Sequence, residues 1–211
     1  MMLARMMFLA ALFLFASCKS KTTENTEQSR VKEQASLCKH APILAPLIDP
    51  AKLDTIQGKR AATPRLRKAC YWLETALRDD KDPTKVIQRA QSITGYQNEA
   101  RAQAVLESLL RNRTILERLG CLSESGMDKL RRGKAPTITK GRYVGELATV
   151  DHIIPRSVCP ELDNRLYNLE FMPDTLNKRK SDKVGDRQKQ LAEKWRRSGL
   201  LSEDSYRRVT P

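Results

Sequence analysis

The stretch TVDHIIPRSVCPELDNRLYNLEFMPDTLNKRKSDK, residues 149–183, decides the expected fold. Residues 135–154 are β-branched and punctuated by glycine, which predicts a strand or hairpin that ends at Asp151 and His152. NLEFMP, residues 168–173, predicts a second short strand. The residues that follow predict a helix with Asp174 as its N-cap. The predicted order is therefore strand, loop, strand and helix, with an acidic residue and a histidine side by side at the end of the first strand.

Helices are predicted on both sides of this stretch. Leu66, Cys70 and Leu73 recur at spacings of three and four, as on one buried helical face. Residues 40–64 mix prolines with apolar residues and predict short helical turns around the core, with His40 on the surface. Gly120 is a natural helix stop, and Gly185 is expected to break or kink the helix that contains it. The predicted helices span residues 63–79, 82–93, 98–120, 125–133, 174–199 and 200–209.

These elements define an α+β fold that is mostly α. A helical region, residues 37–133, precedes a small region of two strands and C-terminal helices, residues 134–211. Only 5 % of the residues are aromatic while 30 % are charged, a composition that favours a helical protein over a β-sandwich.

The N-terminus predicts export. Arg5 is followed by a short apolar run, Met6–Ala16, too short to span a bilayer core of about 30 Å as a helix. Residues 1–18 end in LFASC, which resembles a bacterial lipobox with Cys18 as the lipidated residue, although Phe15 stands where that pattern prefers Leu. The alternative is ordinary signal cleavage and a secreted protein. Residues 19–36 are polar and predict a disordered tether.

The remaining cysteines fit an oxidising compartment. They are even in number, and we expect at least one disulfide among Cys38, Cys70, Cys121 and Cys159, with the pairing left open. A zinc site is the competing reading, but no Cys-x-x-Cys spacing supports it.

The formal net charge of +14 favours a polyanionic partner. Nucleic acid, anionic lipid and lipopolysaccharide all carry the negative charge that such an excess of Lys and Arg attracts.

The central stretch resembles the HNH endonucleases, whose catalytic unit is the ββα-metal motif. The matching residues are DHIIPRS, NLEFM and LNKRKSDK. Asn177 stands in the place of the family's last histidine, an H-N-N variant that also occurs in HNH domains of CRISPR effector nucleases. The resemblance extends from near Ala135 to near Gln190, and residues 37–130 resemble no family that we recognise.

The resemblance implies a role for each matching residue. Asp151 and Asn177 would offer side-chain oxygens to one divalent cation, Mg²⁺ with Mn²⁺ as the alternative, because hard cations prefer oxygen ligands. His152 would act as general base. Asn168 would orient the histidine, and Asn164 competes with it for this role. Phosphate contacts are assigned to the basic residues Arg156, Lys178, Arg179, Lys180 and Lys183.

The leading hypothesis is a metal-dependent endonuclease of the cell envelope that cleaves DNA, with RNA as a further substrate. The first alternative is an envelope protein that binds nucleic acid through an inactive site. The second is a basic structural lipoprotein, which explains the charge but not the order of the motif. A membrane is expected as partner only through the lipid on Cys18, and no protein partner is inferred.

The expected export and lipidation can be tested at the N-terminus. We expect mass spectrometry of the mature protein to find Cys18 as the first residue, carrying lipid. A chain that still begins at Met1, or that stays wholly in the cytoplasm, would contradict export. A soluble form cleaved near Cys18 would retain export and remove only the lipid.

Overall fold

Two antiparallel strands and the helix that follows them carry most of the predicted site. The computed structural model describes residues 39–58 and 60–211. Strand β1 (Ala148–His152) pairs with β2 (Leu169–Pro173), so that Val150 lies opposite Phe171 and Asp151 opposite Glu170. Helix α7 (Asp174–Lys180) follows β2 directly. The predicted order of elements, strand, loop, strand and helix, is confirmed.

The two faces of this small sheet have different neighbours. Side chains alternate between the faces of a strand, so Thr149 and Asp151 share one face while Val150 takes the other. Helix α7 covers the first face: Asn177 donates to Thr149 Oγ1 at 3.0 Å and Lys180 donates to Asp151 Oδ2 at 2.8 Å. Val150 is buried, as is its partner Phe171. The pairing register therefore decides which residues meet α7.

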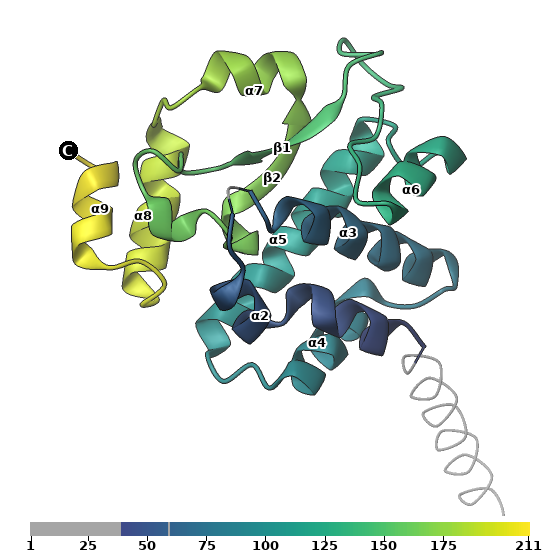
Figure 1. Cartoon of the computed structure of the whole chain (residues 1–211), viewed down its shortest axis with the longest axis horizontal. Coiled ribbons are helices and arrows are strands. Elements are labelled where there is room, and N and C mark those ends of the chain that lie inside the picture. Colours follow the sequence, from purple (N-terminus) through teal and green to yellow (C-terminus); the bar gives the residue numbers. More distant parts are fainter. Residues whose placement is uncertain (1–38, 59) are drawn as a thin grey trace, which may run out of the picture. The chain divides into compact units, whose positions relative to one another are not determined.

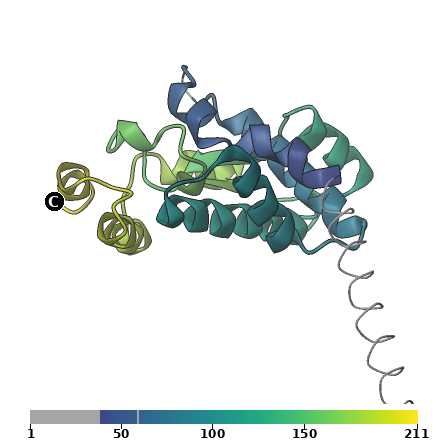
Figure 2. The same cartoon turned by 90° about the horizontal axis from the view of Figure 1, so that it is seen from below.

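Helices make up most of the rest of the described chain. Residues 39–48 are helical. In Figure 1, helices α2 to α6 lie on one side of the strands and α8 and α9 on the other, and the turned view in Figure 2 agrees. Residues 40–211 form one compact unit. The elements are α2 (Pro50–Thr55), α3 (Thr63–Arg78), α4 (Pro83–Thr94), α5 (Glu99–Arg118), α6 (Glu124–Arg131), α8 (Asp186–Arg197), α9 (Glu203–Val209) and the 3₁₀ turns η1 (Pro160–Leu162) and η2 (Leu166–Asn168).

The mostly helical α+β class is confirmed, and the differences are local. The stretch 135–154 forms a strand only over β1, joined by an isolated bridge between Thr137 and Leu147. The predicted helix 174–199 is two helices, because Ser181 adopts a φ of 50° after α7 and Gly185 is the N-cap of α8. Asp174 is the first residue of α7 rather than its N-cap, a place taken by Pro173.

His40 was predicted on the surface, and this prediction is wrong. The residue is only 1 % exposed, and its Nε2 lies 2.9 Å from Asp79 Oδ2 at the end of α3. A buried imidazole needs such a partner, because an unpaired polar group in the core is costly. Helical turns were predicted for this segment, but no partner for His40 was visible in the sequence; residues 39–48 are a helix that buries the ring.

The expected disulfide is not found among the described cysteines. Cys70, Cys121 and Cys159 are free and buried. Burial raises the pKa of Cys121 and of Cys159 to about 11, so both stay protonated near neutral pH. These side chains act as small apolar core residues. Cys38 lies outside the described residues, as do the predicted signal, Cys18 and the tether. No helix of the part described here is long and apolar enough to cross a membrane.

Helix α5 holds β2 in place through the side chain of Asn112. This residue is fully buried, accepts from the backbone N–H of Phe171 at 2.9 Å and donates to the carbonyl of Leu169 at 2.9 Å. Its amide thus pairs with the free edge of β2 as a neighbouring strand would. Ser108, one turn earlier, donates to the carbonyl of Leu166. The long helix therefore fixes the position of the second strand.

Replacing Asn112 should destabilise the whole fold. We expect Asn112→Ala to lower the free energy of unfolding by about 2–4 kcal/mol, because it leaves the buried N–H of Phe171 without a partner and the C=O of Leu169 with only a 3.5 Å hydrogen bond from Arg111. Denaturant unfolding measures the loss. Gln103→Ala, an exposed change on the same helix, should stay within about 0.5 kcal/mol of the parent. Equal stability of the two variants would show that α5 does not hold β2.

Candidate functional site

A cleft of about 670 Å³ brings together residues from the end of β1, from the loop that follows it and from α7. Asp151, His152 and Asn177 line it, together with the basic residues Arg156 and Lys178. A second hollow, of about 770 Å³, lies between α8 and α9 and contains none of the predicted site residues. The first cleft is therefore the candidate site, because it gathers groups of different chemistry in one place.

The ring of His152 is held by one residue of the loop between the strands. Its Nε2 lies 2.9 Å from the backbone carbonyl oxygen of Asp163 and 2.9 Å from Asp163 Oδ1. Both partners are acceptors, so Nε2 carries the hydrogen and Nδ1 keeps a free lone pair. Among the described residues, the buried side-chain atoms without a hydrogen-bond partner include Nδ1 of His40 but not Nδ1 of His152. Nδ1 of His152 is thus the nitrogen able to accept a proton in the cleft.

Asp151 is nearly buried and shares its carboxylate with a lysine. Only 6 % of the residue is exposed, and Oδ2 accepts a hydrogen bond from Lys180 Nζ at 2.8 Å. The same ammonium donates to the carbonyl of His152 at 2.7 Å. Lys180 therefore ties the end of β1 to α7. Oδ1 of Asp151 has no hydrogen-bond donor among the described residues.

Asn177 presents its amide oxygen in a defined way. Its Nδ2 donates to Thr149 Oγ1 at 3.0 Å, which fixes the orientation of the amide. Oδ1 accepts no hydrogen bond from the residues that the structure describes. One carboxylate oxygen and one amide oxygen without donors, in the same cleft, fit a hard divalent cation that keeps several waters. Neither in this cleft nor in the rest of the described chain are three His, Cys, Asp or Glu side chains placed to hold a metal.

Asn168 acts on the loop rather than on the histidine ring. It is fully buried; its Oδ1 accepts from the N–H of Ile154 at 2.8 Å, and its Nδ2 donates to the carbonyls of Ile154 and Leu162. It makes no hydrogen bond to the side chain of His152 within the described chain. The competing candidate, Asn164, instead bonds to the segment before α3. Asn168 thus orients His152 only through the backbone that surrounds it.

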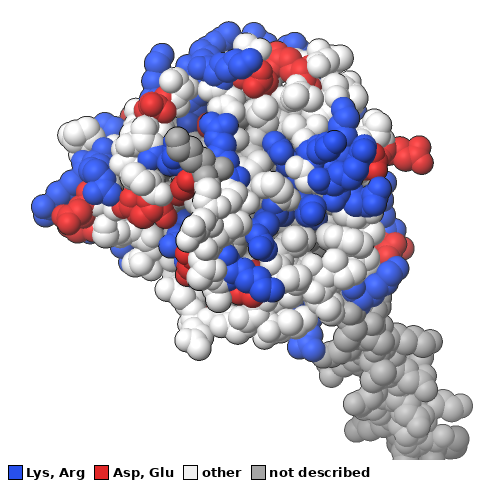
Figure 3. Space-filling model, in the orientation of Figure 1, with Lys and Arg blue, Asp and Glu red and all other residues white. Residues whose placement is uncertain are grey.

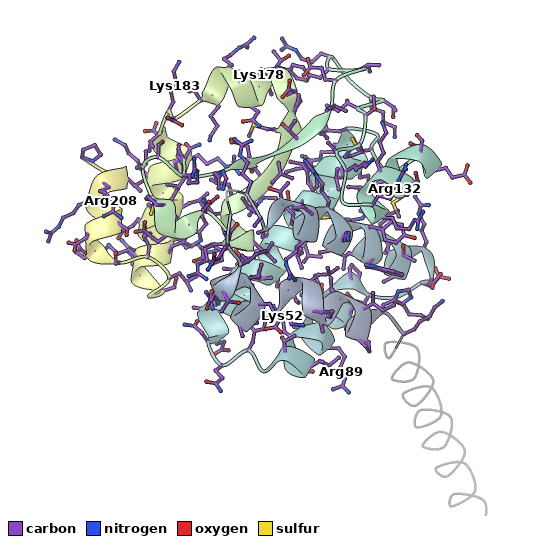
Figure 4. The ribbon with its side chains drawn as sticks, in the orientation of Figure 1. Lys52, Arg89, Arg132, Lys178, Lys183 and Arg208 are labelled. Carbon is purple, nitrogen blue, oxygen red and sulfur yellow. The ribbon has the colours of Figure 1, made fainter. Side chains whose placement is uncertain are left out.

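The predicted phosphate-binding residues differ in their freedom. Arg156 and Lys178 line the cleft, whereas Lys180 is engaged by Asp151. Lys178 pairs with Asp174 at 2.6 Å, and this hydrogen bond raises the pKa of the lysine. Arg179 and Lys183 are exposed. Lys and Arg gather over α7 in Figure 3, and Figure 4 shows Lys178 and Lys183 pointing outward near this helix.

Sequence reasoning missed three residues around the site. Asp163 holds His152, and Arg60 lines the cleft from the segment before α3. Glu170, 3 % exposed, receives two hydrogen bonds from Arg187, at 2.7 and 2.5 Å, which raise the pKa of the arginine. A charged residue inside the apolar run LEFM was the available signal for Glu170. Nothing in the sequence marked Asp163 or Arg60.

Comparisons of this chain with protein-family models, curated proteins and solved structures found no match.

The loop between the strands should depend on Asn168. We expect Asn168→Ala to lower the free energy of unfolding by about 2–4 kcal/mol, since the N–H and C=O of Ile154 would lose their buried partner. Asn168→Asp keeps an acceptor for the N–H but sets a carboxylate oxygen against two carbonyls, so it should not restore stability. Ser157→Ala, an exposed change in the same loop, serves as control. If denaturant unfolding gives all three variants a free energy of unfolding close to that of the parent, Asn168 does not stabilise the loop.

Proposed function

We propose that the protein is a metal-dependent endonuclease that hydrolyses phosphodiester bonds of DNA, with RNA as an alternative substrate. One observation carries the proposal: a single cleft contains His152 with Nδ1 free, together with the unpaired oxygens of Asp151 and Asn177. The resemblance of DHIIPRS, NLEFM and LNKRKSDK to the HNH motif supports the same chemistry. The predicted export signal supports action in the cell envelope or outside the cell.

The chemistry divides among the residues of the cleft. Nδ1 of His152 takes a proton from the attacking water as its oxygen bonds to phosphorus and the bond to the leaving sugar oxygen breaks. Asp163 keeps the ring in place and stabilises the positive charge that the imidazole gains. Asp151 and Asn177 would hold the cation, Mg²⁺ or alternatively Mn²⁺. Such a cation, when bound, offsets the negative charge that grows on the phosphate.

One observation favours a second candidate, a protein that binds nucleic acid without cutting it. The ammonium of Lys180 lies 2.8 Å from Asp151 Oδ2, where it meets the carboxylate expected to hold the cation. If that ion pair keeps the cation out, the cleft binds phosphate through its basic residues alone. Incubation of the mature domain with supercoiled plasmid, in magnesium and in chelator, distinguishes the two candidates, because only the nuclease nicks the plasmid in magnesium.

Removing the histidine should abolish cleavage and spare binding. We expect His152→Ala to reduce the nicking rate by about 10²–10⁴-fold, the usual effect of losing a general base. Binding to duplex DNA, measured in chelator, should remain within about twofold because the imidazole moves a proton and contacts little backbone. Lys52→Ala, an exposed change on α2, should leave both unchanged. Cleavage by His152→Ala at the parent rate would refute the mechanism.

The cation ligands should show a different signature from the histidine. We expect Asp151→Ala and Asn177→Ala to lose activity that higher magnesium or manganese partly restores, because each removes one oxygen that holds the ion. The measurement is a metal titration of the nicking rate for each variant beside His152→Ala. Restoration of His152→Ala by metal, without restoration of the other two, would reverse these assignments.

A further inference from the structure

Arg60 reaches the candidate site from a part of the chain that the motif does not include. It lies in the connection between α2 and α3, is exposed, and lines the same cleft as Asp151 and His152. Its backbone φ is 57°, a left-handed conformation that a residue with a side chain rarely adopts. A residue kept in such a conformation needs surroundings that hold it there.

The loop that holds His152 also holds Arg60. Asp163 Oδ1, which binds the histidine, accepts a long hydrogen bond from the N–H of Arg60 at 3.4 Å. Asn164 Oδ1 accepts from the N–H of Ala62 at 3.1 Å, and Asn164 Nδ2 donates to the carbonyl of Ile56. These contacts fasten both ends of the connection to the turn at Asp163 and Asn164. The position of Arg60 is therefore set relative to the histidine ring.

Arg60 differs in its charge balance from three other cations near the cleft. Lys180 is paired with Asp151, Lys178 with Asp174 and Arg187 with Glu170. Within the described residues, the guanidinium of Arg60 has no acidic partner and donates no hydrogen bond, and the same holds for Arg156. Both line the cleft. Two unpaired guanidinium groups beside the proton acceptor are suited to an anion with several oxygens, which for the proposed substrate is a backbone phosphate.

We propose that Arg60 binds a phosphate of the nucleic-acid backbone next to the bond that is cut, in the cleft that Arg156 also lines. This inference rests on the proposed function and extends it, because it assigns part of the substrate site to the helical region. The contact is to phosphate, so it contributes to affinity and to position without selecting a base sequence.

Arg60→Gly tests the proposal without harming the fold. Glycine adopts a positive φ readily, so this variant should be at least as stable as the parent while it loses the side chain. We expect the slope of log K against log salt, measured with a short DNA duplex in chelator, to fall by about 0.9, the value for one phosphate contact. The dissociation constant at low salt should rise by about two- to fivefold, as for one exposed ion pair. Arg60→Lys, which keeps the charge, should restore most of the slope.

Arg89→Ala is the matched control. This arginine is exposed on α4, and Figure 4 shows it at the end of the view opposite Lys178. Its removal should change neither the slope nor the nicking rate. Parent-like slope and affinity for Arg60→Gly, or an equal loss for Arg89→Ala, would overturn the proposal. A parent that binds DNA but fails to nick it in magnesium would refute the nuclease while the slope still decides the role of Arg60. A parent that does not bind the duplex overturns both.

Discussion

The buried amide of Asn168 is the constraint on which the site depends. Strand β1 ends at His152 and β2 begins at Leu169, and the loop between them has no regular ladder of backbone hydrogen bonds. Asn168 replaces that ladder, because it pairs with both backbone groups of Ile154 and with the carbonyl of Leu162. This fixes the loop immediately after the histidine and also near Asp163. The ring of His152 and the carboxylate that holds it are thus positioned by one side chain.

The turn at Asp163 and Asn164 extends this order to the helical region. Asp163 contacts His152 and the backbone of Arg60, and Asn164 contacts the segment on both sides of Arg60. Arg165, the next residue, pairs with Asp54 of α2, which Arg101 of α5 also binds. Helix α5 in turn supports β2 through Asn112. The helical region therefore supports the site in two places, at the turn of Asp163 and Asn164 and along β2. This support is a structural role for residues 37–133, which lie outside the HNH-like stretch.

The sequence predicted the elements of the site better than their contacts. The β-branched run before His152 predicts a strand, and the spacing of Leu66, Cys70 and Leu73 predicts a buried helical face, because these patterns follow from local geometry. Asp163 and Arg60 could not be found this way, since their roles arise from contacts between segments far apart in the chain. His40 was misjudged for the same reason: its burial depends on Asp79, at the far end of another helix. The cysteines suggested disulfides by number, but pairing also requires close approach, which a count does not reveal, and the described thiols are free.

The ion pair of Lys180 with Asp151 bears directly on how the cleft would work. An ammonium that donates to both Asp151 Oδ2 and the carbonyl of His152 fixes the carboxylate in place and reduces its net charge. A cation would then approach the remaining oxygen, Oδ1, beside the amide oxygen of Asn177. Two oxygens, only one of them from a charged group, hold a hard cation weakly, so such an ion would depend on the substrate phosphate for further ligands. The unpaired guanidinium groups of Arg60 and Arg156 would bring that phosphate into the cleft. The bound phosphate would then supply the further oxygen ligands that the cation needs, so the nucleic acid would increase the affinity of the cleft for the cation.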